Sequence, residues 1–198
     1  MSVPTVRFEA EVPVRYAADV AVLGGGMAGV CAAAAAAAAG ARVVLVERFA
    51  VTGGLLTTGG VANFCGPMEG QGEVFDEILA DLRAWKAIGQ EGRESVFHPE
   101  VLAFVLQELL LRRGVRLLLH ARFADVRADA GRIAEAIVCG KSGPAAVRAR
   151  QFVDCTGDAD VARAAGFAVM KGRPSDGLQL PMSLMYFVRH VSPDAPIQ

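Results

Sequence analysis

The feature that most constrains the fold is an uncharged stretch near the N-terminus, from Val20 to Ala41, which contains a cluster of glycines. A stretch of this length without charge is long enough to span a bilayer. Its glycines and its many alanines, which insert weakly into lipid, argue against a transmembrane helix. The segment before it is too long and too acidic for a secretory signal peptide. We therefore expect no membrane span, and we expect the stretch to be buried inside a folded domain.

The pattern around the stretch predicts a strand, a turn, a helix and a second strand. Residues 19–23 and 41–46 are short apolar runs typical of buried strands. Residues 27–39 are mostly alanine without proline, which favours a helix, and Gly40 stands where a helix C-terminal glycine is expected. Such a unit closes as a right-handed crossover between parallel strands. The sequence thus predicts an α/β fold with a Rossmann-like parallel sheet built on a βαβ unit.

The segments after the second strand alternate between loops, helices and strands. A glycine-rich loop is expected over residues 52–72, since its periodicity is weak. Helical periodicity over residues 73–88 places Ile78, Leu82 and Trp85 on a core-facing side. A second helix is predicted over residues 99–113, because Pro99 suits a first helical position.

Strands dominate the next part of the sequence. The pattern predicts a strand over residues 115–120, a hairpin over 123–138, a further strand over 145–150, another over 151–154, and then an alanine-rich helix ending at Ala165. The hairpin and the strand that follows form an antiparallel β-meander inserted into the parallel fold. We also expect Leu184–Val188 to begin a strand.

Composition and charge exclude several classes of function. A formal net charge of −1 lacks the surplus of lysine and arginine that a nucleic-acid surface needs. The four cysteines show no CxxC spacing, which argues against a zinc site, or any other metal site, and against a disulfide scaffold. We therefore expect a cytoplasmic protein without metal.

The glycine cluster follows the G-x-G-x-x-G pattern of dinucleotide-binding turns. Gly24 permits the tight turn, Gly26 lets a pyrophosphate approach the backbone, and Gly29 allows close helix-to-strand packing. The first helical residues, Met27 and Ala28, offer free N–H groups to the phosphates. The pattern follows a predicted strand and opens a predicted helix, which raises its specificity.

An acidic residue completes this pattern. Glu47 ends the second predicted strand, where a carboxylate accepts hydrogen bonds from the adenosine ribose hydroxyls. A carboxylate there repels a 2′-phosphate, although the neighbouring Arg48 weakens that argument. A glycine turn and an exposed strand-end glutamate without ligand are the alternative interpretation.

The sequence resembles a known family over most of its length, from about Asp19 to Met185. The resemblance rests on three motifs: DVAVLGGGMAGVCAAAAAAAAGARVVLVER, a following Gly-Gly pair, and FVDCTGDADVARAAG. They resemble the FAD-dependent oxidoreductases of the glutathione-reductase-like superfamily, and within it the relatives of the flavin subunits of fumarate reductase and heterodisulfide reductase.

The resemblance implies FAD as cofactor and assigns it further contacts. The second motif, with Thr156, Gly157 and Asp158, is implied to hold the ribityl chain through its final aspartate. The resemblance also implies that Arg48, Gly53 and Gly54 lie along the pyrophosphate and ribityl side, and that the backbone near Phe123 meets the adenine. This second motif favours FAD over NAD, because a simple dehydrogenase has no reason to carry it. The alternative for Asp158 is an ordinary helix N-cap.

Other reactive side chains carry weaker hypotheses. Cys65 could face the flavin as a redox or nucleophilic thiol, but a cysteine that merely sits in a loop is the simpler interpretation. His98 is expected at a helix N-terminus, and neither His120 nor His190 has a partner at a catalytic spacing. Cys31 and Cys155 are expected to be packing residues, as are most small side chains beside such turns. No catalytic acid or base is assigned.

The resemblance also suggests a division of the chain and a function. Residues 1–175 are expected to form the FAD-binding domain, and residues 176–198 to begin a substrate domain whose remainder, with its return segment near the flavin ring, is missing. We expect exposed apolar surface near this tail, and association with a second copy or a second chain. The leading hypothesis is an FAD-dependent oxidoreductase acting on a small molecule, or its FAD-binding portion. The alternatives are a non-catalytic dinucleotide-binding module, a split-enzyme half that needs a partner chain, and a simple NAD-binding enzyme.

Overall fold

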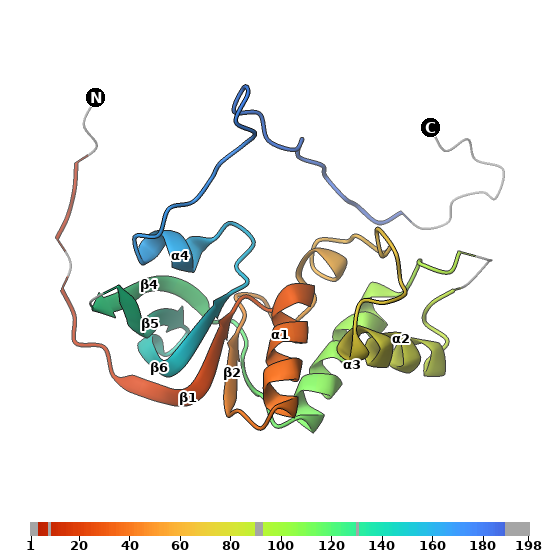
Figure 1. Ribbon diagram of the computed structural model, residues 1–198, viewed down its shortest axis with the longest axis horizontal. Helices are drawn as coiled ribbons and strands as arrows, with labels where there is room; N and C mark the ends of the chain where they lie inside the picture. Colours follow the sequence, from red (N-terminus) through yellow and green to blue (C-terminus); the bar gives the residue numbers. More distant parts are fainter. Residues whose placement is uncertain (1–3, 8, 90–92, 130, 189–198) are drawn as a thin grey trace.

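One mixed sheet with helices on both faces makes up the fold (Figure 1). The computed structural model describes residues 4–7, 9–89, 93–129 and 131–188. In chain order the elements are β1 (Val14–Leu23), α1 (Met27–Ala38), β2 (Val43–Val46), the short 3-10 helix η1 (Gly54–Leu56), α2 (Glu73–Ala84), α3 (Pro99–Arg112), β3 (Arg116–Leu118), β4 (Arg122–Asp129), β5 (Arg132–Gly140), β6 (Gly143–Asp154) and α4 (Asp160–Ala164). The strand order is β3-β2-β1-β6-β5-β4.

The predicted βαβ unit is confirmed. Strands β1 and β2 pair in parallel, with Leu23 opposite Val46, and α1 connects them. Helix α1 ends at Ala38, and Gly40 follows with φ of 86°, a conformation that glycine adopts without strain. The small side chains of α1 let it lie close to the sheet, where Val30 and Ala33 are fully buried.

The antiparallel meander is also confirmed, but its last strand differs from the prediction. Residues 145–150 and 151–154 were expected to form two strands, and they form the single strand β6. The expected break lies at polar residues, yet β6 pairs with β1 in parallel along most of its length and with β5 antiparallel over its first half. The meander is therefore joined to the parallel sheet through β6.

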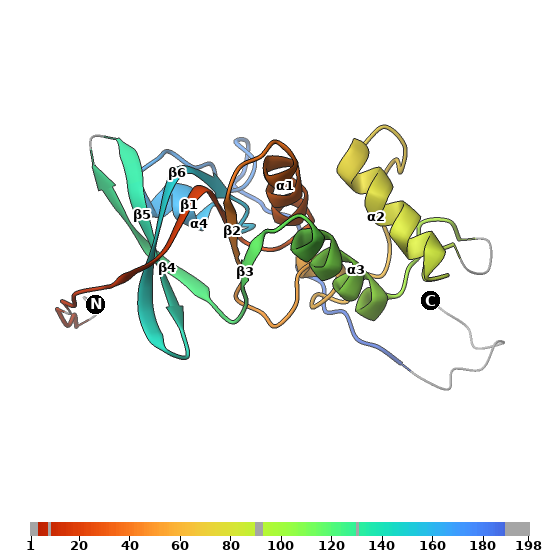
Figure 2. The same ribbon diagram turned by 90° about the horizontal axis from the view of Figure 1, so that it is seen from below.

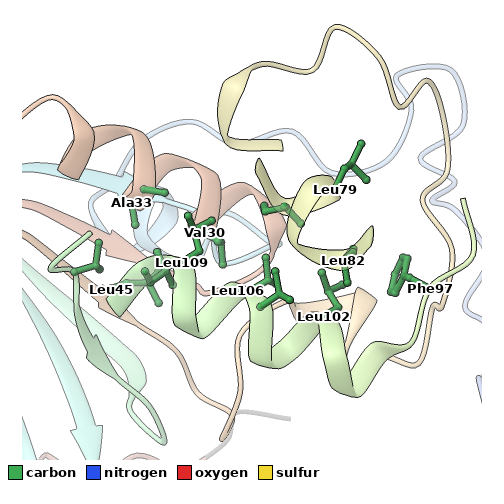
Figure 3. Packing of buried hydrophobic residues seen from close by; sticks show 14 of the residues in the cluster. Val30, Ala33, Leu45, Leu79, Leu82, Phe97, Leu102, Leu106 and Leu109 are labelled. Atoms are coloured by element: carbon green, nitrogen blue, oxygen red, sulfur yellow. The ribbon is translucent and has the colours of Figure 1, made fainter. Parts of the chain in front are cut away.

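Two apolar clusters lie on opposite faces of the sheet. Along β1, Val22 faces the cluster beneath α1, α2 and α3, whereas Ala21 and Leu23 face the cluster that Val161 of α4 covers. Figure 2 shows α1 beside the sheet and α2 farther out. Figure 3 shows the helical cluster, in which Leu102, Leu106 and other leucines of α3 interdigitate with α1 and α2. Burying each such leucine contributes about 1.5–3 kcal/mol.

Two expectations outside the sheet are wrong. Trp85 was expected in the core, but it is 60% exposed and packs edge-on against Phe104 at a centroid distance of 5.3 Å. Helix α2 ends at Ala84, before the predicted Ile88, so the helical periodicity no longer applies at Trp85. Leu184–Val188 does not form a strand, and its large side chains are exposed. Within the described ranges, no helix is both long and apolar enough to cross a bilayer.

Candidate functional site

The first glycine turn, residues 24–29, joins β1 to α1 and leaves no room for side chains at two of its glycines. A Cβ on Gly24 would lie 2.1 Å from the carbonyl oxygen of Cys155, and one on Gly29 would lie 1.9 Å from that of Gly24. Gly24 also has φ of 100°. A Cβ on Gly26, by contrast, would meet nothing within 4 Å, because Gly26 faces open space. The tight turn at Gly24, the open space at Gly26 and the close packing at Gly29 are the geometry that the pattern predicts.

The α1 N-terminus opens onto the same space. Within the described residues no side chain caps α1, and its first turn carries no acidic residue. The first N–H groups of an α-helix have no acceptor inside the helix, so those of Met27 and Ala28 are available to a ligand. The helix dipole adds partial positive charge there, which favours an anion such as a pyrophosphate.

Glu47 lies at the end of β2 and is held by the first turn. Its side chain is buried, and its Oε2 accepts a hydrogen bond from the backbone N of Gly25 at 2.7 Å. Its Oε1 accepts one from the backbone N of Phe49 at 2.8 Å. Each carboxylate oxygen has a second lone pair, so Glu47 can still accept hydrogen bonds from two ribose hydroxyls. The backbone bonds fix the orientation of the carboxylate in advance.

The first Gly-Gly pair of the long loop docks on the first turn. The backbone N of Gly53 donates to the carbonyl oxygen of Gly25 at 2.7 Å, and Gly26 and Gly53 form an isolated parallel bridge. A Cβ on Gly54 would lie 3.0 Å from the Cα of Gly26. This close approach explains the glycine at residue 54, whereas a Cβ on Gly53 would lie 2.4 Å from the side chain of Thr57. The docked loop lies along the predicted pyrophosphate side.

The second glycine turn, residues 155–159, joins β6 to α4. Asp158 is exposed there, and among the residues that the structure describes its carboxylate makes no hydrogen bond or ion pair. The N-cap alternative for Asp158 is wrong, because Ala159 occupies the N-cap position without a side-chain bond. The first N–H groups of α4 bond instead to Thr156 and Asp154. Asp158 is left free to face a ligand.

The two turns lie side by side although they are far apart in the sequence. The backbone N of Cys155 donates to the carbonyl oxygen of Leu23 at 2.8 Å, and Gly24 touches the Cys155 carbonyl. Both turns border one cleft of about 1070 Å³. Of the predicted cofactor residues, all except Gly29 line this cleft: Gly24, Gly26, Met27, Ala28, Glu47, Arg48, Gly53, Gly54, Phe123, Thr156, Gly157 and Asp158. Gly29 faces the strand, as its packing role requires.

Phe123 joins the cleft through β3 and β4. The backbone N of Ala121 donates to the carbonyl oxygen of Glu47 at 2.9 Å, which brings the start of β4 beside the acidic residue. The pairing of β4 with β5 is irregular between Phe123 and Asp125, so Ala124 lies at a β-bulge. A bulge leaves backbone groups outside the ladder. Ala124 also lines the cleft, where such groups can meet a flat heterocycle.

Among the described residues three arginines line the cleft, and only one of them was predicted as a cofactor contact. Arg48 was predicted, and its guanidinium lies 4.7 Å from the ring centre of Phe49, a cation–π distance. Arg122 begins β4 and Arg163 lies on α4. These positive charges suit a ligand that carries phosphates. Sequence patterns did not indicate Arg122 or Arg163, because their placement depends on the curl of the meander and on where α4 lies.

The remaining reactive side chains lie outside the cleft or serve packing. Cys65 is exposed and does not line the cleft, and its Sγ lies 3.8 Å from the carbonyl oxygen of Asn63. His98 is the N-cap residue of α3, as expected, and His120 lies exposed in the turn after β3. Burial raises the pKa of the Cys31 thiol. His190 lies outside the described residues.

Cys155 differs from the other three cysteines because it borders the cleft. Burial, and then the charge of Asp154, raise the pKa of its thiol. A raised pKa keeps the thiol protonated and weakly nucleophilic at neutral pH. Cys155 therefore has the packing role that the sequence suggested, and it contacts the apolar cluster beneath α1.

Solved structures with the same architecture come from several enzyme types. THI4 from Thermovibrio ammonificans superposes with a TM-score of 0.60 at 20% identity, over 79% of this chain and 67% of that one. The p-nitrophenol 4-monooxygenase PnpA from Pseudomonas putida gives 0.61 at 18% identity, over 80% and 46%. A geranylgeranyl bacteriochlorophyll reductase-like protein from Thermoplasma acidophilum gives 0.57 at 20% identity, over 77% and 42%. At such identities the likeness shows the fold alone.

The sequence comparisons add the family. The chain spans less than half the length of the monooxygenase and of the reductase-like protein. No curated protein matches the sequence. Residues 19–198 match the family described as FAD dependent oxidoreductase, a range that contains both glycine turns and Glu47. This chain therefore belongs to the FAD-dependent oxidoreductase family.

Proposed function

We propose that this chain is the FAD-binding portion of an oxidoreductase and that it holds FAD in the cleft between the two glycine turns. The single observation that carries the proposal is the gathering of the predicted cofactor residues, from four separate segments, around one cleft of about 1070 Å³. That volume is at the upper end of the usual range for ligand sites, about 300–1,000 Å³, as an extended dinucleotide requires. When bound, FAD supplies the hydride or electron transfer of the reaction.

The two turns bind different parts of the cofactor. Glu47 accepts hydrogen bonds from the ribose of the adenosine half, and the backbone N–H groups of Met27 and Ala28 bind the pyrophosphate. Arg48 and the Gly53-Gly54 pair lie along the same side. Asp158 accepts hydrogen bonds from the ribityl hydroxyls. Backbone groups at Phe123 and the neighbouring bulge meet the adenine.

The surroundings of Glu47 support FAD or NAD over a ligand with a 2′-phosphate. Two backbone N–H groups hold the buried carboxylate in place, so it cannot swing away from a negative group. The second turn then supports FAD over NAD, because it adds a second free carboxylate, Asp158, to the cleft, and a simple NAD-binding enzyme has no need of it. We infer that the chain groups with the glutathione-reductase-like superfamily, near the flavin subunits of fumarate reductase and heterodisulfide reductase.

The tail supports a division into residues 1–175, which form the FAD-binding domain, and residues 176–198, which begin a substrate domain. Regular structure ends with α4 among the described residues, and the chain beyond it crosses the top of the molecule in Figure 1. Its large apolar side chains are exposed, with Leu180 at 92% and Met182 at 100%. Exposed apolar surface of this kind is normally covered. We propose that further polypeptide covers it and that the substrate is a small molecule.

The same tail supports the second candidate, a half of a split enzyme that needs a second chain or a second copy of itself. In that case the bound flavin is reduced only after a partner polypeptide is added. We place either form of the protein in the cytoplasm, since all four cysteines are free and a reducing compartment keeps them so.

The visible spectrum of the purified chain tests the proposed function. We expect flavin absorbance, or its recovery after FAD is added and unbound FAD is removed by gel filtration. Competition by NAD at similar concentration would point to the NAD-binding alternative. A colourless protein that takes up no FAD would overturn the proposal. Reduction of the bound flavin by electron donors, measured with and without candidate partner chains, distinguishes the two candidate functions. Reduction without a partner supports the FAD-binding portion of an oxidoreductase, and reduction only with a partner supports the split half.

A further inference from the structure

The carboxylate of Asp154, the last residue of β6, is the centre of a hydrogen-bond network at the second glycine turn. Its Oδ1 accepts from the backbone N of Thr156 at 3.0 Å and from the Thr156 hydroxyl at 2.7 Å. Its Oδ2 accepts from the backbone N of Ala162 at 2.9 Å. One side chain thus ties the end of the strand to both the turn and helix α4.

The Thr156 hydroxyl extends this network across the turn. While it donates to Asp154, its oxygen accepts a hydrogen bond from the backbone N of Asp160 at 2.8 Å. The network therefore holds both ends of the short segment that contains Asp158. The residues on either side of Asp158 have positive φ, 93° at Gly157 and 54° at Ala159. An alanine rarely adopts this conformation unless its surroundings impose it.

Asp154 and Asp158 differ in how they meet the cleft. Asp158 lines it and has no partner among the described residues, whereas Asp154 is not part of its lining. Asp154 can affect a ligand only through the turn that it holds. We infer that Asp154 is a positioning residue, whose carboxylate fixes the turn so that Asp158 presents its own carboxylate to the ribityl chain of FAD. This inference rests on the proposed function.

The variant Asp154→Asn tests the inference with FAD and ADP as probes on the full chain. Asparagine has nearly the same shape as aspartate, but its amide nitrogen cannot accept a hydrogen bond. With that nitrogen in the place of Oδ2, the bond from the backbone N of Ala162 is lost. ADP contains the adenosine and pyrophosphate groups, which the first turn binds. We expect the Kd for FAD, measured by flavin fluorescence, to rise about tenfold, equal to about 1.4 kcal/mol. Because the first turn is unchanged, we expect the Kd for ADP, measured by calorimetry, to change less than about twofold.

A double-mutant cycle shows whether Asp154 acts through Asp158. If it does, Asp154→Asn has little further effect on FAD binding once Asp158→Ala is present. Asp129→Asn, which removes an exposed carboxylate at the far end of β4, is the matched control and should leave both affinities unchanged. Should Asp154→Asn fail to fold, Thr156→Val replaces the hydroxyl by a methyl group and removes both of its bonds in the network. Because Thr156 also lines the cleft, its selective loss of FAD binding supports the inference only if that loss disappears when Asp158→Ala is present.

Three results would overturn the inference. The first is an unchanged affinity for FAD in both variants. The second is an equal loss of affinity for FAD and for ADP, which indicates general damage to the fold. The third is that the effects of Asp154→Asn and Asp158→Ala on FAD binding simply add. If the unmodified chain binds ADP but not FAD, or binds neither, the proposed function itself fails and the inference fails with it. That result is distinct from the three above, all of which require an unmodified chain that binds FAD.

Discussion

The two glycine turns line the same cleft but are stabilised in different ways. In the first turn, steric exclusion dominates, because a Cβ on Gly24 or Gly29 would lie about 2 Å from a backbone oxygen. In the second, a Cβ on Gly157 would meet nothing within 4 Å, and side-chain hydrogen bonds from Asp154 and Thr156 hold the backbone. The first turn tolerates no added atom at Gly24 or Gly29, whereas the second turn tolerates an added atom at Gly157 but depends on its polar partners.

The largest effect is expected from Gly29→Ala. The new methyl group would overlap the carbonyl oxygen of Gly24 at 1.9 Å, so α1 must move away from β1. We expect a loss of about 3 kcal/mol in the free energy of unfolding, the upper end of overpacking penalties. Denaturant unfolding followed by circular dichroism measures it. A loss below about 0.5 kcal/mol, as at an ordinary surface site, would show that the first turn is not sterically closed.

The next effect is expected from Glu47→Ala. Two backbone N–H groups, at Gly25 and Phe49, lose their acceptor, and the ribose loses its partner. We expect FAD binding to weaken by roughly 1.5–3 kcal/mol, the range for hydrogen bonds to a charged group. Fluorescence titration gives the affinity. Glu135→Ala is a useful control, since Glu135 is equally buried but binds Arg127 and Arg148 on the meander, away from the cleft. Retention of full affinity in Glu47→Ala would contradict the assigned role.

A third effect separates binding from folding within the first turn. Gly26 has φ of −65° and open space where its Cβ would stand, so Gly26→Ala is compatible with the fold. We expect stability to change by less than about 1 kcal/mol, because the lower entropy of the unfolded chain offsets a poorer N-cap. The methyl group enters the cleft at the α1 N-terminus, so the Kd for FAD should rise about tenfold, or about 1.4 kcal/mol. Equal affinities for Gly26→Ala and the unmodified protein would place the pyrophosphate elsewhere.

The smallest effect is expected from Gly157→Ala in the second turn. No atom collides with the added methyl group, and the remaining cost is that of a left-handed backbone, with φ of 93°. We expect a destabilisation of about 1 kcal/mol. Thermal unfolding of this variant beside Gly29→Ala gives the direct contrast. If the two variants lost equal stability, the distinction between a sterically closed turn and a hydrogen-bonded turn would be wrong.

The difference between the turns also explains what the sequence could predict. The βαβ unit and the first turn depend on local patterns: two apolar runs, glycines at fixed spacing, and an alanine helix that ends before Gly40. Steric constraints of this kind specify residue types, so they are visible in a single sequence. The proposed role of Glu47 rests in the same way on its place at the end of the second strand.

Features that depend on distant partners could not be predicted in this way. Asp154 belongs to the second motif but was given no role, because its bonds to Thr156 and Ala162 exist only once the turn and α4 are formed. Strands were predicted separately over residues 145–150 and 151–154, yet Gln151 pairs with Val20 of β1 and β6 continues through the expected break. Trp85 was placed in the core by a periodicity that stops where α2 stops. In each of these cases tertiary contacts, which a local sequence pattern does not contain, determine the structure.

The pairing of β6 with β1 has a consequence for biosynthesis. The first turn lies within a stretch that emerges early from the ribosome, and its partners Glu47 and Gly53 follow soon after it in the sequence, whereas Cys155 comes much later. The second turn reaches its place only when β6 aligns with β1, which requires almost all of the intervening chain to have been translated. Contacts so distant form slowly. A nascent chain that lacks β6 therefore has only part of the proposed cofactor site, and the part that contains Asp158 is completed last.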